Sequence, residues 1–395
     1  MLTHIAALGD VAFINPRQET RPGGDTVVSF LRMSDVGTDG TTTPGTDRPF
    51  SDVAKGYTQF SQNDVLVAKI TPCFENGKIA QATTRHARAA GSTEFHVVRP
   101  KANVVDGRYL HYFLRQPIIR LVGEKRMTGS AGQRRVPESY LAELRIPVPP
   151  IEEQRKIASM LNEVELLRTM RRQTIGFMSE LGESIFSDIF GNGSEPLTTR
   201  PLKEVADVAS GITKGRKVPS GTPLRTVPYL AVANVQDKRL NLSAVKTIEA
   251  SESEIERYRL HKDDLLLTEG GDPDKLGRGT LWNNEIPEAI HQNHIFRVRL
   301  LNQHHVNPVF LNWYVGSDFG KRYFLRSAKR TTGIASINST QLKNFPLRLP
   351  PIHQQEEFAE KLAEIREVKS LQNTHMHVLD ELFDSLQARA FHGEL

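Results

Sequence analysis

The chain has 395 residues, a formal net charge of +5 and a pI of about 9.2, with 38% hydrophobic and 25% charged residues. The length predicts two or three domains, the composition is that of a soluble globular protein, and the absence of an 18-residue apolar run argues against a membrane span. The N-terminal residues lack the features of a secretory signal, and the single cysteine, Cys73, cannot form an internal disulfide. We therefore expect a cytoplasmic protein, and its basic charge is compatible with a polyanionic partner.

Residues 1–150 predict a mixed globular domain. Val27–Leu31 and Val65–Ile70 are rich in β-branched and apolar residues and are flanked by turn formers, which predicts strands. The turn-rich stretch 37–49 predicts a surface loop. Aromatic and leucine residues at helical spacing from 106 to 121 predict short helices, and the same pattern returns from 306 to 324.

Two long helices are predicted after these domains. No proline occurs from Glu152 to Phe190 or from His353 to Ala390, and such lengths indicate a coiled coil. One heptad register fits both stretches, with an apolar seam at each end and polar residues in the middle, at 168 and 171 of the first helix and 369 and 372 of the second. We predict that the two helices pair antiparallel within the chain; the alternative is that each helix packs on its own domain. The seam residues expected to form this spacer and to dock partners are Ile157, Leu161, Val164, Met178, Ile185, Phe358, Leu362, Ile365, Leu379 and Leu386.

Two copies of one unit account for the whole chain. Residues 146–154 (Ile-Pro-Val-Pro-Pro-Ile-Glu-Glu-Gln) are matched by residues 347–355 (Leu-Arg-Leu-Pro-Pro-Ile-His-Gln-Gln). Further pairs follow in the same order: 8–11 with 202–205, 28–36 with 227–235, 60–77 with 260–277 and 128–131 with 332–335. The repeat predicts an α+β fold with a pseudo-twofold axis and four segments, namely domain 1 (1–150), helix 1 (151–191), domain 2 (192–351) and helix 2 (352–395).

Motifs of catalysis and cofactor binding are missing or weak. Neither nucleotide-binding glycine loop occurs. Residues 307–310 (Asn-Pro-Val-Phe) and 272–275 (Asp-Pro-Asp-Lys) distantly resemble methyltransferase and nuclease motifs, but their counterparts in the other copy have no such character, so we interpret them as a helix start and a turn. The histidine pairs 291/294 and 375/377 have no further His or Cys ligands clustered with them that would complete a metal site. We expect no catalysis by this chain alone, no cofactor and no metal.

Basic residues gather in the predicted loops of both domains, and several flank the Thr-Gly-x-Ala segments at 128–131 and 332–335. Such residues neutralise DNA phosphates, arginine also reads guanine, and an amide such as that of Gln133 can read adenine. For any single residue a solvated surface charge is the plainer interpretation, but the recurrence in both copies favours nucleic acid. The candidate DNA-binding residues are Lys69, Arg85, Arg126, Gln133, Arg134, Arg135, Lys214, Arg216, Lys217, Arg278, Lys329 and Arg330.

The Pro-Pro-Ile…Gln junction that leads each domain into a long helix resembles the specificity subunit of type I restriction–modification systems, and the resemblance covers essentially the whole chain. The family junction reads Pro-Pro-(Leu or Ile)-x-Glu-Gln; residues 149–154 match it, whereas residues 350–355 carry Gln354 in place of Glu. The resemblance implies that each domain reads one half of a split, asymmetric DNA target. It also implies that the helices set the gap between the halves and dock methyltransferase subunits. Double-stranded DNA and two methyltransferase subunits are the implied partners, and whether restriction subunits join them stays open.

Two other classes of function remain as alternatives. A tandem protein–protein scaffold would use the same basic loops to bind acidic partners, and salt-dependent, sequence-selective DNA binding would distinguish it from a DNA reader. A nuclease or a fused methyltransferase would have to show metal-dependent or methyl-donor-dependent turnover by the purified chain.

Overall fold

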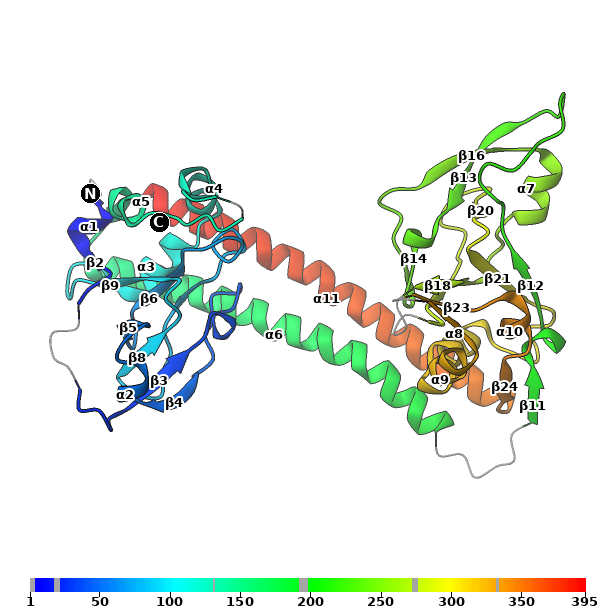
Figure 1. The fold of residues 1–395 in the computed structure, drawn as a ribbon, viewed down its shortest axis with the longest axis horizontal. Helices are drawn as coiled ribbons and strands as arrows, with labels where there is room; N and C mark the ends of the chain where they lie inside the picture. The colour runs from blue at the N-terminus through cyan, green and yellow to red at the C-terminus, as the bar shows by residue number, and fades with distance from the viewer. Residues whose placement is uncertain (1–3, 18–21, 131, 192–197, 272–275, 332–333) are drawn as a thin grey trace. The chain divides into compact units, whose positions relative to one another are not determined.

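The computed structural model describes residues 4–17, 22–130, 132–191, 198–271, 276–331 and 334–395. The chain divides into two compact units, and each is described by itself (Figure 1). Unit 1 comprises Met1–Thr174 and Gln372–Leu395, and unit 2 comprises Ile175–Leu371. Each unit therefore contains one globular domain together with a stretch of both long helices.

The globular domain of unit 1 is built on two four-stranded sheets. Its strands are β1 (His4–Ala7), β2 (Ala12–Ile14), β3 (Val27–Leu31), β4 (Thr46–Pro49), β5 (Thr58–Ser61), β6 (Val65–Ala68), β7 (Ile79–Gln81), β8 (Arg88–Gly91), β9 (Phe95–Pro100) and β10 (Arg145–Val148). Its helices are α1 (Leu8–Val11), the 3-10 helix η1 (Met33–Asp35), α2 (Phe50–Val53), α3 (Gly107–Leu114), α4 (Pro117–Arg126) and α5 (Glu138–Glu143). The sheets have the orders β2-β9-β6-β7 and β4-β3-β8-β5, and β1 pairs with β10. Helix α3 lies against β6, β7 and β9.

Unit 2 repeats this plan. Its strands are β11 (Thr198–Pro201), β12 (Ala206–Ser210), β13 (Arg225–Leu230), β14 (Val235–Gln236), β15 (Arg239–Leu240), β16 (Lys246–Ala250), β17 (Leu265–Thr268), β18 (Gly270–Gly271), β19 (Gly279–Leu281), β20 (Ile290–His291), β21 (Ile295–Leu300), β22 (Lys329–Thr331), β23 (Ile334–Ser336) and β24 (Pro346–Leu349). Its helices are η2 (Leu202–Glu204), η3 (Val232–Asn234), α7 (Glu252–Tyr258), α8 (Pro308–Gly316), α9 (Asp318–Ser327) and α10 (Ser339–Lys343). The sheet orders are β12-β21-β17-β19, β16-β13-β20 and β18-β23-β22, with the pairs β14-β15 and β11-β24.

The central sheets of the two domains match strand for strand, which confirms the internal repeat. The order β2-β9-β6-β7 in unit 1 corresponds to β12-β21-β17-β19 in unit 2. The register is also the same, because Val65 pairs with Val98 and Leu265 pairs with Val298. Even a buried ion pair recurs at equivalent positions: a guanidinium nitrogen lies 2.7 Å from the carboxylate in both Arg99–Asp64 and Arg299–Asp264.

The central strand of each domain is apolar throughout because both of its faces are covered. In β6, Val65 and Val67 face the cluster that includes α3, whereas Leu66 faces the cluster of the second sheet. In β17 the same division separates Leu265 and Leu267 from Leu266. A strand buried on both faces gains from burial at every position, so it appears in the sequence as a continuous apolar run instead of an alternating one.

The long helices are α6 (Ile151–Phe190) and α11 (Ile352–His392), and they run antiparallel in each unit. In unit 1, Arg168 bonds to Asp380 at 2.6 Å and Arg171 donates a hydrogen bond to Gln372. In unit 2, the Lys369 ammonium donates to Ser179 Oγ at 2.8 Å. The polar middle of the predicted seam is therefore hydrogen-bonded between the helices. Packing of each helix on its own domain, the alternative considered above, occurs as well: Leu161 of α6 lies in the unit 1 core, and Phe358 of α11 packs with Trp313 of α8. The far end of each helix packs on the other domain, with Phe391 of α11 in the unit 1 core and Phe186 of α6 against the unit 2 core.

One local prediction was wrong in part. The last four residues of the loop expected at 37–49 form strand β4, which pairs with β3 from Val27↔Pro49 to Phe30↔Thr46. The prediction missed this edge strand because the segment contains the turn formers Pro44, Gly45 and Pro49. A proline is tolerated in an edge strand, since one side of the strand makes no ladder hydrogen bonds. In the described part of the chain, no helix is both long and apolar enough to cross a membrane.

Candidate nucleic-acid interface

Each domain is fixed to its long helix by a buried glutamine, and this contact orients whatever surface the domain presents. The Gln154 side chain accepts a hydrogen bond from Asp106 N at 2.9 Å and donates to Val104 O at 3.0 Å and Pro149 O at 2.8 Å. Gln355 accepts from Asn307 N at 2.9 Å and donates to His305 O at 3.4 Å and Pro350 O at 2.8 Å. The two junctions therefore make the same three bonds, although Gln354 replaces the usual glutamate in the second.

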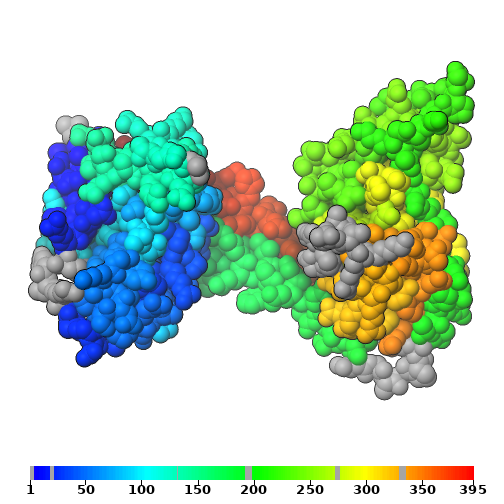
Figure 2. Space-filling model, viewed as in Figure 1, coloured from blue at the N-terminus to red at the C-terminus, as the bar shows by residue number. Residues whose placement is uncertain are grey.

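In unit 1 the loop after α4 is held against the end of β6. Thr128 and Arg135 exchange two backbone hydrogen bonds of 3.0 and 2.8 Å, and Gly129 and Gly132 adopt φ values of +123° and +76°, which glycine reaches without strain. Val136 N donates to Lys69 O at 2.8 Å, which ties this loop to the segment that follows β6. The fold thus brings together five predicted residues: Lys69, Arg126, Gln133, Arg134 and Arg135. Figure 2 shows the stretch that contains α4, coloured cyan to green, at the surface of unit 1.

The charges in this loop are partly neutralised within the protein. Arg135 makes a two-pronged contact with Glu94, at 2.9 and 2.8 Å, and this hydrogen bonding holds the pKa of the Glu94 carboxyl below its usual range. Arg134 lies 3.8 Å from both Glu75 and Glu124. Gln133 and Arg126 are exposed, and neither side chain bonds to another described residue. Arg126 and Gln133 are therefore the groups in this loop that are most available to a ligand.

Arg85 does not belong to this group. It precedes β8 in the other sheet, its backbone N donates to Ser29 Oγ at 3.1 Å, and its guanidinium lies 3.6 Å from Asp47. The sequence could not reveal this separation, because it depends on which sheet each loop leaves.

The predicted residues of unit 2 also fall into two groups. Lys214 and Lys217 are exposed in the loop that follows β12. Between them, Arg216 bonds to Glu254 of α7 at 2.5 and 2.6 Å and to Glu249 O at 2.9 Å. This contact lowers the pKa of Glu254 to about 2. Arg216 and Glu254 therefore form a structural ion pair that holds the loop after β12 against α7.

The second group consists of Arg278, Lys329 and Arg330, and Arg278 directly precedes β19. Its Nε atom is buried and has no hydrogen-bond partner among the described residues. Lys329 and Arg330 form strand β22, which pairs with β23, and β23 also pairs with β18. The side chains of Lys329 and Arg330 lie outside the described residues, as do Ala131, residues 272–275 and residues 332–333.

The predicted seam residues are largely buried inside their own unit. Ile157, Leu161 and Val164 pack with Leu379 and Leu386 in the unit 1 core. In unit 2, Ile185 packs with Phe358 and Leu362, while Met178 and Ile365 are half-buried. Five of the ten are buried and cannot contact a partner, so the docking role does not fit them: Ile157, Leu161, Val164, Phe358 and Leu362. The other five are half-buried, and the packing of the whole set fits the spacer role.

The exposed apolar residues of the long helices form a different set, which the heptad pattern did not single out. In unit 1 they are Met160, Leu166, Leu167, Met170, Val378 and Leu382, and in unit 2 Phe177, Leu181, Val368 and Leu371. Met170 is 55% exposed and Phe177 69%. Large apolar side chains left in water over consecutive helical turns mark surfaces that other proteins cover.

The histidines and the Asn-Pro segment considered in the sequence analysis have structural surroundings that can be described. No group of three or more His, Cys, Asp or Glu residues in the part of the chain that the structure describes could hold a metal ion. His291 is buried and its Nδ1 contacts Tyr258 O at 3.1 Å, while His294 lies 2.6 Å from Glu269. The Asn307 side chain accepts hydrogen bonds from Val309 N and Phe310 N at 2.8 and 3.4 Å, which confirms the predicted helix start.

Comparison with known proteins gives matches over both halves of the chain. The sequence model of the type I restriction modification DNA specificity domain matches residues 8–175 and again 194–379. The specificity subunit of the Escherichia coli type I restriction enzyme EcoAI is 43% identical over 111 residues, which is 28% of this chain and 19% of that protein. The corresponding EcoEI subunit of Escherichia coli is 36% identical over 163 residues, or 40% of this chain and 27% of that protein. The matched stretches thus span about a fifth and about a quarter of these two relatives.

A solved structure shares the fold of the chain as a whole. The structure, which concerns complex assembly and conformational transition of the type I R-M system, aligns over 99% of this chain and 98% of its own, with 16% identity and a TM-score of 0.62. At this identity the likeness concerns the fold, and it covers both domains and both long helices.

Proposed function

We propose that this chain, which belongs to the family of the type I restriction modification DNA specificity domain, is the DNA-recognition subunit of a type I restriction–modification enzyme. One observation carries the proposal: the family's sequence model matches twice, and each match spans a globular domain and a stretch of helix. Each domain reads one half of a bipartite target. The chain itself transfers no methyl group and cuts no DNA; those reactions belong to its partners.

The difference between the two domains supports an asymmetric target. Their central sheets agree in strand order and register, whereas their outer elements differ. Helix α7 has seven residues where its counterpart α2 has four, and the β14–β15 hairpin stands where unit 1 has the single bridge Val36↔Thr42. At the position of the β18-β23-β22 sheet, the described residues of unit 1 form only the bridges Ile70↔Arg135 and Thr128↔Arg135. Since base readout depends on side chains carried by such outer elements, the two domains read different half-sites.

The long helices set the gap between the half-sites. A matched deletion tests this role. The pairs Arg168–Asp380 and Ser179–Lys369 place residues 168–174 of α6 opposite residues 374–380 of α11, so removing both segments keeps the remaining helix pairs in register. Seven residues correspond to about 10 Å of helix, which is about three base pairs of DNA. The expected result is a preferred gap about three base pairs shorter with both half-sites unchanged; an unchanged gap preference would contradict the spacer role.

The exposed apolar residues of the long helices support docking of methyltransferase subunits. Helices of a partner would cover these side chains, and each unit exposes such a set, which is consistent with two partner subunits. This assignment replaces the buried seam residues with Leu166, Met170 and Phe177 as the expected contacts.

An exchange of domains tests the reading function itself. Residues 1–145 are replaced by the equivalent domain of another family member, and the DNA target of the assembled enzyme is determined before and after. One half-site is expected to change and the other to stay. A change in both half-sites contradicts the two-reader proposal, and sequence-independent binding by both proteins would favour a protein–protein scaffold.

A further inference from the structure

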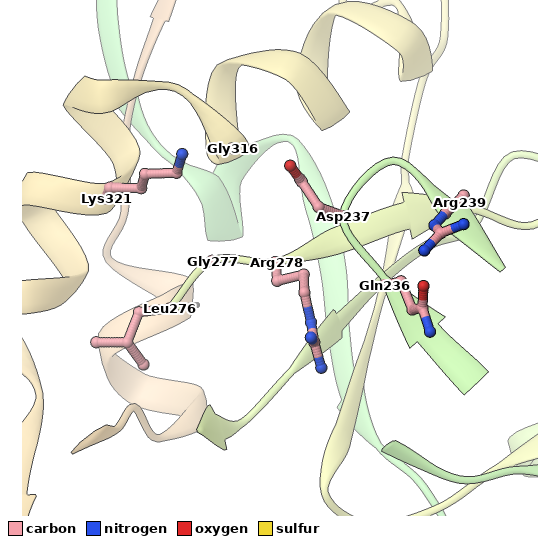
Figure 3. Close-up of a pocket in the computed structure, with 8 residues that line it drawn as sticks. All are labelled: Gln236, Asp237, Arg239, Leu276, Gly277, Arg278, Gly316 and Lys321. Atoms are coloured by element: carbon pink, nitrogen blue, oxygen red, sulfur yellow. The ribbon is translucent and has the colours of Figure 1, made fainter. Parts of the chain in front are cut away.

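A cationic cavity opens in unit 2 beside the loop that precedes β19. It has a volume of about 310 Å³, and its lining includes Gln236, Asp237, Arg239, Gly277, Arg278 and Lys321 (Figure 3). These side chains come from separate elements: Arg239 from β15, Arg278 from the residue before β19, and Lys321 from α9. Figure 3 shows the ends of Arg278, Arg239 and Gln236 on one side of the space and those of Lys321 and Asp237 beside Gly316 on the other.

The cations of this cavity are not neutralised by any residue that the structure describes. Three cations face a single carboxylate, that of Asp237, and none of Arg239, Arg278 and Lys321 makes a side-chain bond to another described residue. The Nε of Arg278 is buried without a partner, which is costly unless a ligand supplies an acceptor. Arg216, Arg225 and Arg297 of the same domain are each paired with a carboxylate, although the Nε of Arg297 is, like that of Arg278, buried without a hydrogen-bond partner among the described residues. An unpaired, partly buried guanidinium therefore indicates an anionic ligand.

A related arrangement occurs at the equivalent place in unit 1, with the difference that the Lys78 ammonium already donates a hydrogen bond to Met33 O at 2.8 Å. Gly77 and Gly277 both have φ of +76°, and each is followed by a basic residue, Lys78 or Arg278. Arg120 occupies the place in α4 that Lys321 occupies in α9, and a Cβ added at Gly77 would overlap the Arg120 guanidinium. The Nε of Arg120 is also buried without a hydrogen-bond partner. The amino acids differ between the copies, but the positive charges are retained at both positions.

We propose that the cavity of Arg239, Arg278 and Lys321 binds one phosphate of the DNA backbone, and that Lys78 and Arg120 bind another in unit 1. This inference rests on the proposed function. A polymeric ligand explains why both copies carry the site, because a duplex that meets two similar domains presents the same charged group to each. Contacts of this kind fix the register of a domain on the duplex and carry no sequence information themselves.

The test measures DNA affinity of the full chain, with its methyltransferase partner, for the variants Arg278→Gln, Lys321→Gln and Arg239→Gln. Duplexes carry either the target or a scrambled sequence, and salt is varied. The control is Lys246→Gln, which removes the same charge from exposed strand β16; Figure 1 places β16 at the opposite end of the domain from α9. Loss of one phosphate contact is expected to weaken binding by roughly 10-fold at 0.1 M salt and to reduce the salt slope by about 1.

The possible outcomes distinguish failure of the phosphate site from failure of the proposed function. An equal loss on target and scrambled duplexes, larger than that of Lys246→Gln, supports the phosphate site. A loss of affinity confined to the target duplex assigns these residues to base reading and overturns the phosphate site. A loss no larger than that of Lys246→Gln also overturns the phosphate site. If the unaltered protein shows no sequence-selective binding at all, the proposed function fails and the phosphate site fails with it. Should Arg278→Gln not fold, Lys321→Gln and Arg239→Gln at the rim carry the test.

Discussion

Replacing Gln355 by alanine should loosen the junction between domain 2 and its helix. The side chain is fully buried and makes three hydrogen bonds to backbone groups, one as acceptor and two as donor. Its removal leaves one N–H group and two carbonyls without partners in the protein interior. At about 1 kcal/mol for each unmade bond, unit 2 should lose about 3 kcal/mol of unfolding free energy.

The chain provides its own reporter and control for this measurement. Both tryptophans, Trp282 and Trp313, lie in unit 2, so urea unfolding followed by tryptophan fluorescence reports on that unit. With a denaturant slope of about 2 kcal/mol per molar urea, the midpoint should fall by roughly 1.5 M. Gln354→Ala is the matched control, because the neighbouring glutamine is half-buried and its side chain bonds to no described residue. Equal midpoints for the two variants would refute the role given to Gln355.

Three further predictions concern packing, pH and docking. Leu161→Ala should lower the unfolding free energy of unit 1 by about 2–5 kcal/mol. Leu167→Ala, at a side chain that is 52% exposed, should lower it by less than about 0.5 kcal/mol. Similar losses for the two variants in urea unfolding would contradict the buried position of Leu161 in the helix seam. Burial lowers the pKa of His291 to about 4, so the folded protein holds this imidazole neutral while the unfolded chain protonates it near pH 6.5. The unfolding free energy of unit 2 should therefore be highest above pH 6.5 and should fall by about 1 kcal/mol between pH 7.5 and 5.5. His291→Gln should reduce this pH dependence in tryptophan-monitored unfolding, and an unchanged pH dependence would assign it to other groups. Met170→Glu should weaken association with the methyltransferase subunits without lowering the melting temperature; unaltered co-purification would exclude this residue from the docking surface.

The long-range features of the fold were predictable where they follow from periodicity. The repeat, the two helices and the antiparallel pairing all come from patterns that extend over many residues, and no single substitution can hide them. The heptad also located the polar middle correctly, because Arg168 and Lys369 interrupt an otherwise apolar seam. What the pattern left open was the choice between a partner helix and a domain as the packing surface, and the structure uses both.

The individual site residues were harder to predict, because their roles depend on contacts that are distant in the sequence. Arg135 appears free in a basic loop, yet its guanidinium is bound to Glu94, 41 residues earlier in the chain. Gln154 is a polar residue in the first turns of a predicted helix, yet it is buried against backbone groups of residues 104, 106 and 149. The repeat itself could have indicated a structural role for this glutamine, because Gln154 and Gln355 recur at the same position after Pro-Pro in the two copies.

The most direct test of the central claim is methylome sequencing of a host that carries this gene and of the same host without it. Two domains that read different half-sites at a set separation predict one methylated motif with two specified parts and a gap of constant length. That motif should be present only when the gene is. A methylome that is identical in both strains, in a host whose methyltransferase partner is active, would contradict the account.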